Sequence, residues 1–190
     1  MDKRNFVDLY LRRTAQIADT CSRESLVKMA EILSITRELG GRVFFLGIGG
    51  GAGSASHATN DFNKIANIST FCLTDNVSLF SALANDEGWE SVFKRQLEMH
   101  RLTAKDCLFI FSVGGGTQTA SKNLVLAIDY AKAVGARIVG VVGRATGATA
   151  QMADACLVVP TIEESMVTPH TEDWQMVINH LLVNLLKQLC

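Results

Sequence analysis

Five short runs of apolar residues, rich in β-branched and aromatic side chains, are spaced along the chain after residue 40. They lie at 43–47, 70–73, 107–111, 138–142 and 156–159, and Pro160 closes the last one. Runs that lack polar alternation are typical of parallel strands, which helices cover on both faces. The pattern therefore predicts a five-stranded parallel sheet.

Segments with helical spacing alternate with these runs. Apolar residues recur three and four positions apart before the first run and before the fourth: Leu26, Met29, Ala30 and Leu33, then Leu124, Ala127, Ile128 and Ala131. A final helix begins at Thr168-Pro169, a helix-start signal, and runs to about Lys187. Alternation of this kind predicts a three-layer, doubly wound α/β fold.

We expect residues 1–190 to form a single domain. The first forty residues predict one long helix or two, additional to the sheet, which pack on the domain or on a neighbouring subunit. The apolar stretch Val177–Leu186 in the last helix requires burial on more than one side. Both features predict a homo-oligomer with sites at subunit boundaries.

Composition excludes several classes of protein. The 190 residues are 48% hydrophobic and 19% charged, with a net charge of −1, which argues against a disordered chain and against a nucleic-acid binder. We find no apolar stretch long enough for a signal peptide or a membrane span. The five cysteines are scattered without CxxC spacing, so we expect reduced thiols and a cytoplasmic location.

Two glycine-rich turns follow the first and third apolar runs, at 47–54 and 112–119. Ligands of open parallel sheets bind beyond the carboxyl ends of the strands. Glycine lets the backbone approach a ligand, and the helix that follows each turn offers free N–H groups to an anion. The turns therefore predict a phosphate site, with these candidate residues: Gly50, Gly51, Ala52, Ser112, Val113, Gly114, Thr117, Thr119 and Ser121.

Other interpretations of the glycines stay open. Gly47, Gly49 and Ala52 have the spacing of a dinucleotide-binding turn, but the next acidic candidate, Asp75, lies too far along the chain. No Gly-Lys-Ser/Thr follows, which excludes a P-loop. The glycines could also serve only to make tight turns.

His57 and Asp61 are four residues apart in the helix after the first turn, which places them on one helical face. His180 lies in the apolar final helix. Imidazole and carboxylate groups bind zinc, and a catalytic zinc site keeps one position open. The alternative is that His180 is a packed, hydrogen-bonded core residue.

The segment Gly47–His57, with Asp61, resembles the Gly-Asn-Gly-Gly-Ser…His…Glu signature of the phosphoheptose isomerases. Asp75 and the pair Asn85-Asp86 fall where that family has Asp and Asn-Asp, and Ser112 begins a segment similar to its Ser-Thr-Ser-Gly phosphate loop. Glu172 and His180 match a Gln and a His eight residues apart. The resemblance covers essentially the whole chain.

This resemblance implies a flavodoxin-like sugar-isomerase (SIS) domain, a homotetramer and bound zinc. It implies that sedoheptulose 7-phosphate is converted to a heptose 7-phosphate by proton transfer through an enediol. The metal ligands would be His57, Asp61, Glu172 and His180, with Asp61 as the base and His180 as the acid. The resemblance also assigns substrate contacts to Asp75, Asn85, Asp86 and Glu172.

The chain departs from that signature at several positions. Gly51 replaces a serine, Val113 replaces a threonine, and Asp61 is one methylene shorter than glutamate. These changes suit an alternative, a non-catalytic SIS module that binds a sugar phosphate or a partner protein. Glu172 and His180 are also about 12 Å apart along a regular helix. Glu172 therefore reaches the same ion only if the side chains converge; otherwise it serves a neighbouring subunit or the helix N-terminus.

Overall fold

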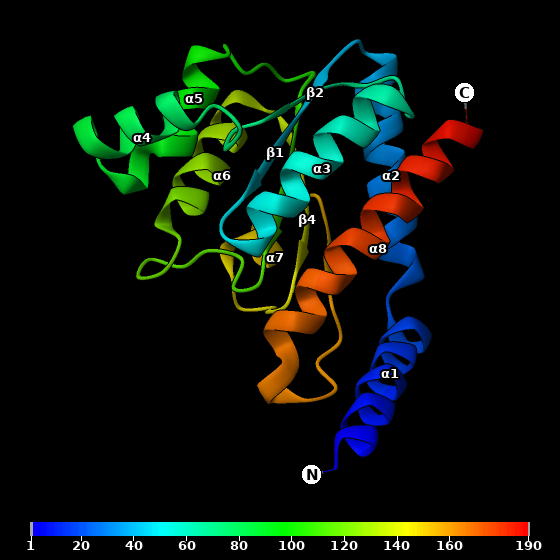
Figure 1. Cartoon of the computed structure of the whole chain (residues 1–190). Helices are drawn as coiled ribbons and strands as arrows, with labels where there is room; N and C mark the ends of the chain where they lie inside the picture. Colours follow the sequence, from blue (N-terminus) through cyan, green and yellow to red (C-terminus); the bar gives the residue numbers. More distant parts are fainter. Residues whose placement is uncertain (1, 190) are drawn as a thin grey trace.

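The computed structural model describes residues 2–189, and its centre is an all-parallel sheet (Figure 1). The strands lie in the order β2-β1-β3-β4-β5. Their bounds are β1 (Arg42–Gly47), β2 (Ser69–Cys72), β3 (Cys107–Ser112), β4 (Arg137–Val142) and β5 (Ala155–Val158). Each predicted apolar run matches a strand to within one residue. The strand order reverses between β1 and β3, so the two glycine turns flank the switch point of a doubly wound sheet.

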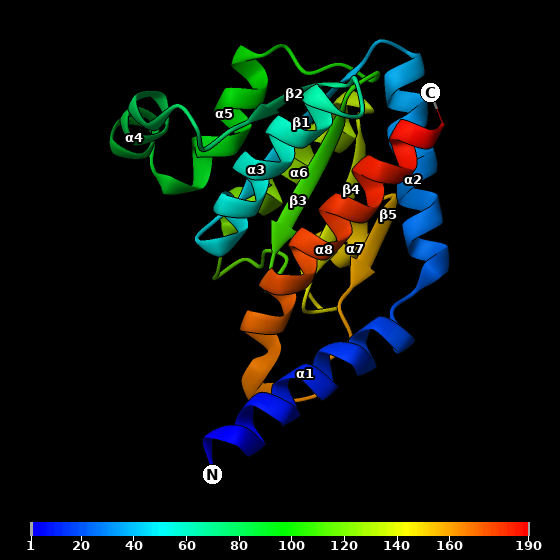
Figure 2. The ribbon, with the colours of Figure 1, turned by 45° about the vertical axis from the view of Figure 1, so that its right-hand side comes forward.

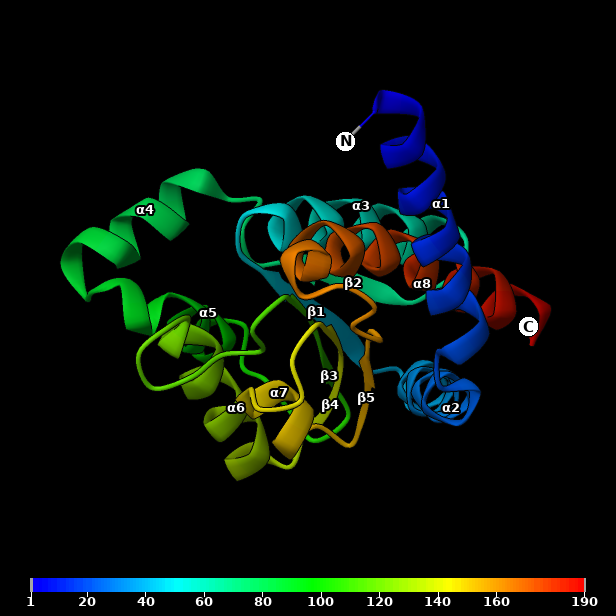
Figure 3. The same cartoon turned by 90° about the horizontal axis from the view of Figure 1, so that it is seen from below.

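Helices cover both faces of the sheet, which confirms the predicted three layers (Figures 1 and 3). One hydrophobic core joins the sheet to α2 (Arg23–Glu38), α3 (Gly50–Lys64) and α8 (Val167–Gln188). The second core joins it to α4 (Val77–Asp86), α5 (Val92–Met99), α6 (Lys122–Val134) and α7 (Ala148–Met152). Two short 3-10 turns, η1 (Trp89–Ser91) and η2 (Glu164–Met166), precede α5 and α8.

Aromatic side chains fix α3 against the sheet. Consecutive residues of β1 point to opposite cores, so Phe44 packs in one core and Phe45 in the other. The Phe62 ring of α3 lies edge-on to Phe45 at 5.2 Å between centroids and contacts Phe109 of β3 at 6.2 Å. Burial of a phenylalanine contributes about 1.5–3 kcal/mol, so these contacts hold α3 firmly in place.

The first forty residues form two helices. α1 (Lys3–Thr20) ends before Ser22, whose hydroxyl caps α2 by accepting a hydrogen bond from the Ser25 N–H at 3.2 Å. Figure 2 shows α1 running beyond the end of the sheet, beside the start of α8. The Tyr10 hydroxyl donates to Asp173 at 2.5 Å and Arg13 pairs with Glu163 at 2.7 Å. The extent of the domain, 1–190, stays a prediction.

The cysteines within residues 2–189 are free thiols. Cys107 is buried in β3, and burial raises the pKa of the half-buried Cys156 in β5 to about 12. Cys190 lies outside the described residues. None of the helices in the described part of the chain is sufficiently long and apolar to cross a membrane.

Candidate active site

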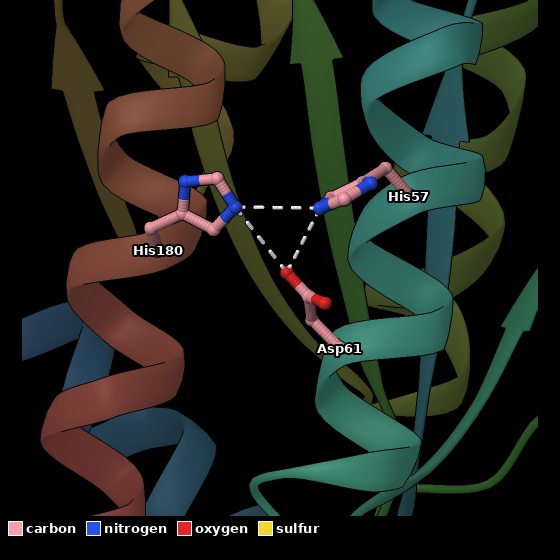
Figure 4. Close-up of side chains that lie close together, drawn as sticks. All are labelled: His57, Asp61 and His180. Atoms are coloured by element: carbon pink, nitrogen blue, oxygen red, sulfur yellow. Dashed lines mark hydrogen bonds and ion pairs between the residues drawn. The ribbon is translucent and has the colours of Figure 1, made fainter.

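His57, Asp61 and His180 meet on the outer side of the α3–α8 pair (Figure 4). His57 Nε2 lies 3.1 Å from Asp61 Oδ2 and 3.3 Å from His180 Nε2, and His180 Nε2 lies 3.6 Å from the same carboxylate oxygen. The His57 and His180 side chains are 47% and 56% exposed, whereas Asp61 is buried. The three side chains therefore form a cluster that opens outward between two helices.

The three donor atoms fit a tetrahedral divalent ion. Ligands about 2.0–2.1 Å from a tetrahedral zinc ion lie about 3.3–3.4 Å from one another. The observed separations of 3.1, 3.3 and 3.6 Å bracket this value. Two imidazoles and one carboxylate are a common donor set for catalytic zinc, and the exposed side leaves room for a further ligand. His57, Asp61 and His180 could therefore hold such an ion.

A buried amide supports the Asp61 carboxylate from the inner side. Asn179 of α8 is fully buried, and its Nδ2 donates to Asp61 Oδ2 at 2.9 Å. Asn60 Nδ2 makes a longer contact, 3.4 Å, with Asp61 Oδ1. Sequence analysis missed Asn179. Its signal was a polar residue at every fourth position of a mostly apolar helix, at Thr171, Gln175 and Asn179, all of which are buried.

Glu172 belongs to α8, but its carboxylate lies away from this cluster and contacts the start of α3. A Cβ atom added to Gly50 would fall 2.4 Å from the Glu172 carboxylate, so the two residues are in close contact. The N-terminus of α3 carries partial positive charge and attracts a carboxylate. Within one chain, the proposed fourth metal ligand therefore faces the first glycine turn and not His180.

The first glycine turn brings α3 close to the neighbouring strands. Gly49, with a φ of +60°, is the residue before α3. A Cβ atom on Gly51 would lie 2.5 Å from the Phe111 carbonyl oxygen of β3, and Gly51 is buried. Packing thus accounts for the glycine at position 51. Gly50 is exposed and Ala52 is half-buried, so both can contact a ligand.

The second glycine turn is held by hydrogen bonds from both sides. The Gly115 N–H donates to Ser112 Oγ at 3.0 Å, and the Thr149 hydroxyl of α7 donates to the Gly115 carbonyl at 2.8 Å. Thr117 Oγ1 accepts from the Ala120 N–H at 2.9 Å. The other predicted residues of this turn are half-buried or exposed, and they are Val113, Gly114, Thr119 and Ser121.

The end of the second turn offers two groups for an anion. Ser121 precedes α6 with a φ of 53°, and its hydroxyl makes no capping hydrogen bond. Lys122, which sequence analysis overlooked, is the first residue of α6, and its Nζ lies 2.7 Å from Glu90. A cation directly after a hydroxyl-rich turn was the available signal.

The remaining predicted substrate residues lie elsewhere. Asp75 is exposed in the turn after β2, where it lines a pocket of about 330 Å³. Asn85 and Asp86 end α4, and the Asn85 amide donates to Asp86 Oδ1 at 2.8 Å. Figure 3 shows α4 at the side of the molecule away from α8. Within one chain these residues do not join the cluster, and their substrate roles stay predictions.

Comparisons with known proteins agree on one family. Residues 5–143 match the SIS domain family. The chain is 34% identical over 187 residues to the lincomycin biosynthesis protein LmbN of Streptomyces lincolnensis, covering 94% of this chain and 66% of that protein. It is 31% identical over 167 residues to the phosphoheptose isomerase of Akkermansia muciniphila, covering 85% of this chain and 83% of the relative.

Solved structures show the same fold. The phosphoheptose isomerase of Francisella tularensis superposes with a TM-score of 0.85 at 20% identity, covering 99% of this chain and all of the other. The phosphoheptose isomerase of Neisseria gonorrhoeae superposes with a TM-score of 0.85 at 22% identity, covering 98% of this chain and all of the other. The chain therefore belongs to the phosphoheptose isomerase family of SIS-domain phosphosugar isomerases.

Proposed function

We propose that this chain interconverts the ketose and aldose forms of a phosphorylated sugar, with sedoheptulose 7-phosphate and a heptose 7-phosphate as the first candidates. The convergence of His57, Asp61 and His180 from two helices carries this proposal. A non-catalytic module would have no need for two imidazoles and a buried carboxylate within hydrogen-bonding reach of one another. The phosphoheptose isomerases among its relatives support the choice of substrate.

Isomerisation moves one proton between adjacent carbons. In this proposal the Asp61 carboxylate takes the proton from the carbon beside the carbonyl, which leaves an enediol, and returns it to the neighbouring carbon. His180, through the ring nitrogen that does not bind the ion, donates a proton to the carbonyl oxygen as the enediol forms and recovers one from the other oxygen as it collapses. When bound by His57, Asp61 and His180, a divalent ion such as zinc would stabilise negative charge on the sugar oxygens.

The phosphate of the substrate is best assigned to the second glycine turn. The first turn already contacts the Glu172 carboxylate through Gly50, and a phosphate there would meet a like charge. At the second turn the Ser121 hydroxyl, which caps no backbone N–H, and the N-terminus of α6 favour an anion, and the Lys122 ammonium there is balanced by Glu90. Anchoring the phosphate here would fix the reacting carbons near Asp61.

We further propose that the protein is a homo-oligomer, in keeping with the tetramer that the family resemblance implies. Phe6, Val7 and Leu11 of α1 are 40%, 55% and 61% exposed. Val177 and Leu181, which flank His180 on α8, are also exposed. A second copy of the chain that covered α8 would bury these side chains and close the open side of the site. Light scattering on the purified chain should find more than one copy, and a stable monomer would contradict this.

The function is tested with full-length protein purified without a chelator. We expect bound divalent metal and turnover of at least one compound in a panel of ketose phosphates. Asp61→Asn and His180→Ala should lower kcat by about 100-fold or more without a change in melting temperature. Glu31→Gln, which alters an exposed carboxylate on α2, is the matched control. Wild-type protein that is inactive on the whole panel, with and without added zinc, would refute the proposal. A stoichiometric protein partner and no bound metal would then support the non-catalytic alternative.

A further inference from the structure

Asn179 is a buried amide in an otherwise apolar part of α8. Its sequence neighbour Ile178 and the next-turn residues Leu182 and Val183 are fully buried, as is Asn179 itself. Its Nδ2 donates to Asp61 Oδ2 at 2.9 Å, but its Oδ1 has no hydrogen-bond partner within residues 2–189. A buried amide oxygen without a partner destabilises the fold, whereas an aliphatic side chain would fill the same space without that loss. Core packing therefore does not explain an asparagine here.

The contact with Asp61 explains it better. Asp61 Oδ2 faces His57 Nε2 at 3.1 Å and His180 Nε2 at 3.6 Å on its outer side, and it faces the Asn179 amide on its inner side. The hydrogen bond from the Asn179 amide therefore fixes the rotation of the Asp61 carboxylate, so that Oδ2 points between the two imidazoles. If the Asn179 amide were turned over, its Oδ1 would face Asp61 Oδ2, and two acceptor oxygens would repel each other.

The length of the Asp61 side chain matches this arrangement. A glutamate at this position has one more methylene, which would carry the carboxylate further from α3. The Asn179 amide already lies at hydrogen-bond distance from Asp61 Oδ2, so a longer side chain in the same direction would collide with it. Asp61 and Asn179 therefore complement each other in length.

We propose that Asn179 is the positioning residue for Asp61. Its amide holds the carboxylate in the orientation that lets His57, Asp61 and His180 bind a divalent ion and lets Asp61 act as a base. This inference rests on the proposed function, and it adds a residue that acts only through Asp61.

The first test measures Zn²⁺ binding to chelator-stripped, full-length protein by titration calorimetry. Loss of a hydrogen-bond partner to a metal ligand typically weakens metal binding by about 10- to 100-fold, and we expect such a loss in Asn179→Ala. Leucine has a size similar to asparagine and no hydrogen-bond donor. Asn179→Leu should therefore show the same loss of Zn²⁺ affinity, and it serves as the test if the alanine variant unfolds. Asn184→Ala is the matched control. Asn184 lies five residues after Asn179, on the exposed side of α8, where its amide donates to the His180 carbonyl at 2.8 Å. Zinc binding of this control should stay within about twofold of wild type.

Steady-state kinetics and a side-chain exchange give independent readouts. Both Asn179 variants should lower kcat for the sugar phosphate and leave KM nearly unchanged, because the phosphate contacts lie at the second glycine turn. Asp61→Glu alone should bind zinc weakly, and adding Asn179→Ala should restore part of that affinity by opening space.

Two outcomes would overturn the inference. The first is zinc affinity and kcat within about twofold of wild type in both Asn179 variants. The second is an Asp61→Glu, Asn179→Ala double variant that binds zinc no better than Asp61→Glu alone. A wild-type protein that binds zinc but isomerises no sugar phosphate would refute the proposed function instead, while the calorimetric comparison of Asn179 would still stand.

Discussion

Two glycines in the first two turns of α3 should respond differently to the same substitution. Gly51 is buried, and a Cβ atom there would lie 2.5 Å from the Phe111 carbonyl oxygen. Gly53 is exposed, and a Cβ atom there would meet nothing within 4 Å. Neither residue has a positive φ, so backbone strain does not separate them. Gly51→Ala and Gly53→Ala therefore isolate the close approach of α3 to β3.

The magnitudes follow from this geometry. Alanine in place of glycine inside a helix stabilises it by about 1 kcal/mol, which is the whole effect expected for Gly53→Ala. At Gly51 the added methyl group would lie about 0.9 Å closer to the backbone of a central strand than ordinary van der Waals contact allows. Overpacking of this kind costs about 1–3 kcal/mol or more, so the propensity gain is cancelled or outweighed. The propensity gain is common to both variants, so we expect Gly51→Ala to be less stable than Gly53→Ala by the overpacking cost alone, about 1–3 kcal/mol.

Urea unfolding at a fixed protein concentration measures the difference. We expect Gly53→Ala to raise the midpoint and Gly51→Ala to leave it unchanged or lower it, with similar slopes. Displacement of α3 also moves His57 and Asp61, so Gly51→Ala should lose turnover while Gly53→Ala keeps it. Equal stabilisation by both substitutions would refute the claim that α3 packs against the β3 carbonyl at this distance.

Two further predictions concern pH and the second glycine turn. The His100 ring packs against aromatic rings of β1 and β2, and burial, aided by the nearby Arg42 charge, lowers its pKa. The unfolded chain then binds the proton more tightly than the folded chain, so the free energy of unfolding falls as the pH drops below about 6.5. His100→Phe should therefore reduce the loss of melting temperature on acidification. An unchanged pH dependence in this variant would contradict the reasoning. Thr149→Val removes the hydroxyl that donates to the Gly115 carbonyl and should cost about 1 kcal/mol, measured by urea unfolding. It should also raise KM for the sugar phosphate more than it lowers kcat, and a variant with unchanged KM would show that this bond does not shape the phosphate site.

The strands and their burial on both faces could be predicted because the signal is local. A parallel strand that is covered on both faces must be apolar at every position, so Phe44 and Phe45 belong to one continuous run although they enter different cores. The pairing of His57 with Asp61 was equally accessible, because residues four apart lie on one face of any helix.

Local patterns did not determine what the final helix contributes. The contact between His57 and His180 joins residues that are 123 positions apart, and it exists because α3 and α8 lie side by side on the same face of the sheet. That packing also directs Glu172 to Gly50 and buries Asn179 against Asp61. A helical period states which residues share a face, but it does not state which neighbour that face will meet.

The amino-acid sequence by itself therefore determined the layers, the two glycine turns and the chemical character of the site residues. Only the tertiary structure decided that His180 joins His57 and Asp61 while Glu172 does not, because side chains on different helices meet according to the offset between those helices. This offset is set by the aromatic packing of Phe62 and by the close approach at Gly51, two contacts made with strands distant in the chain.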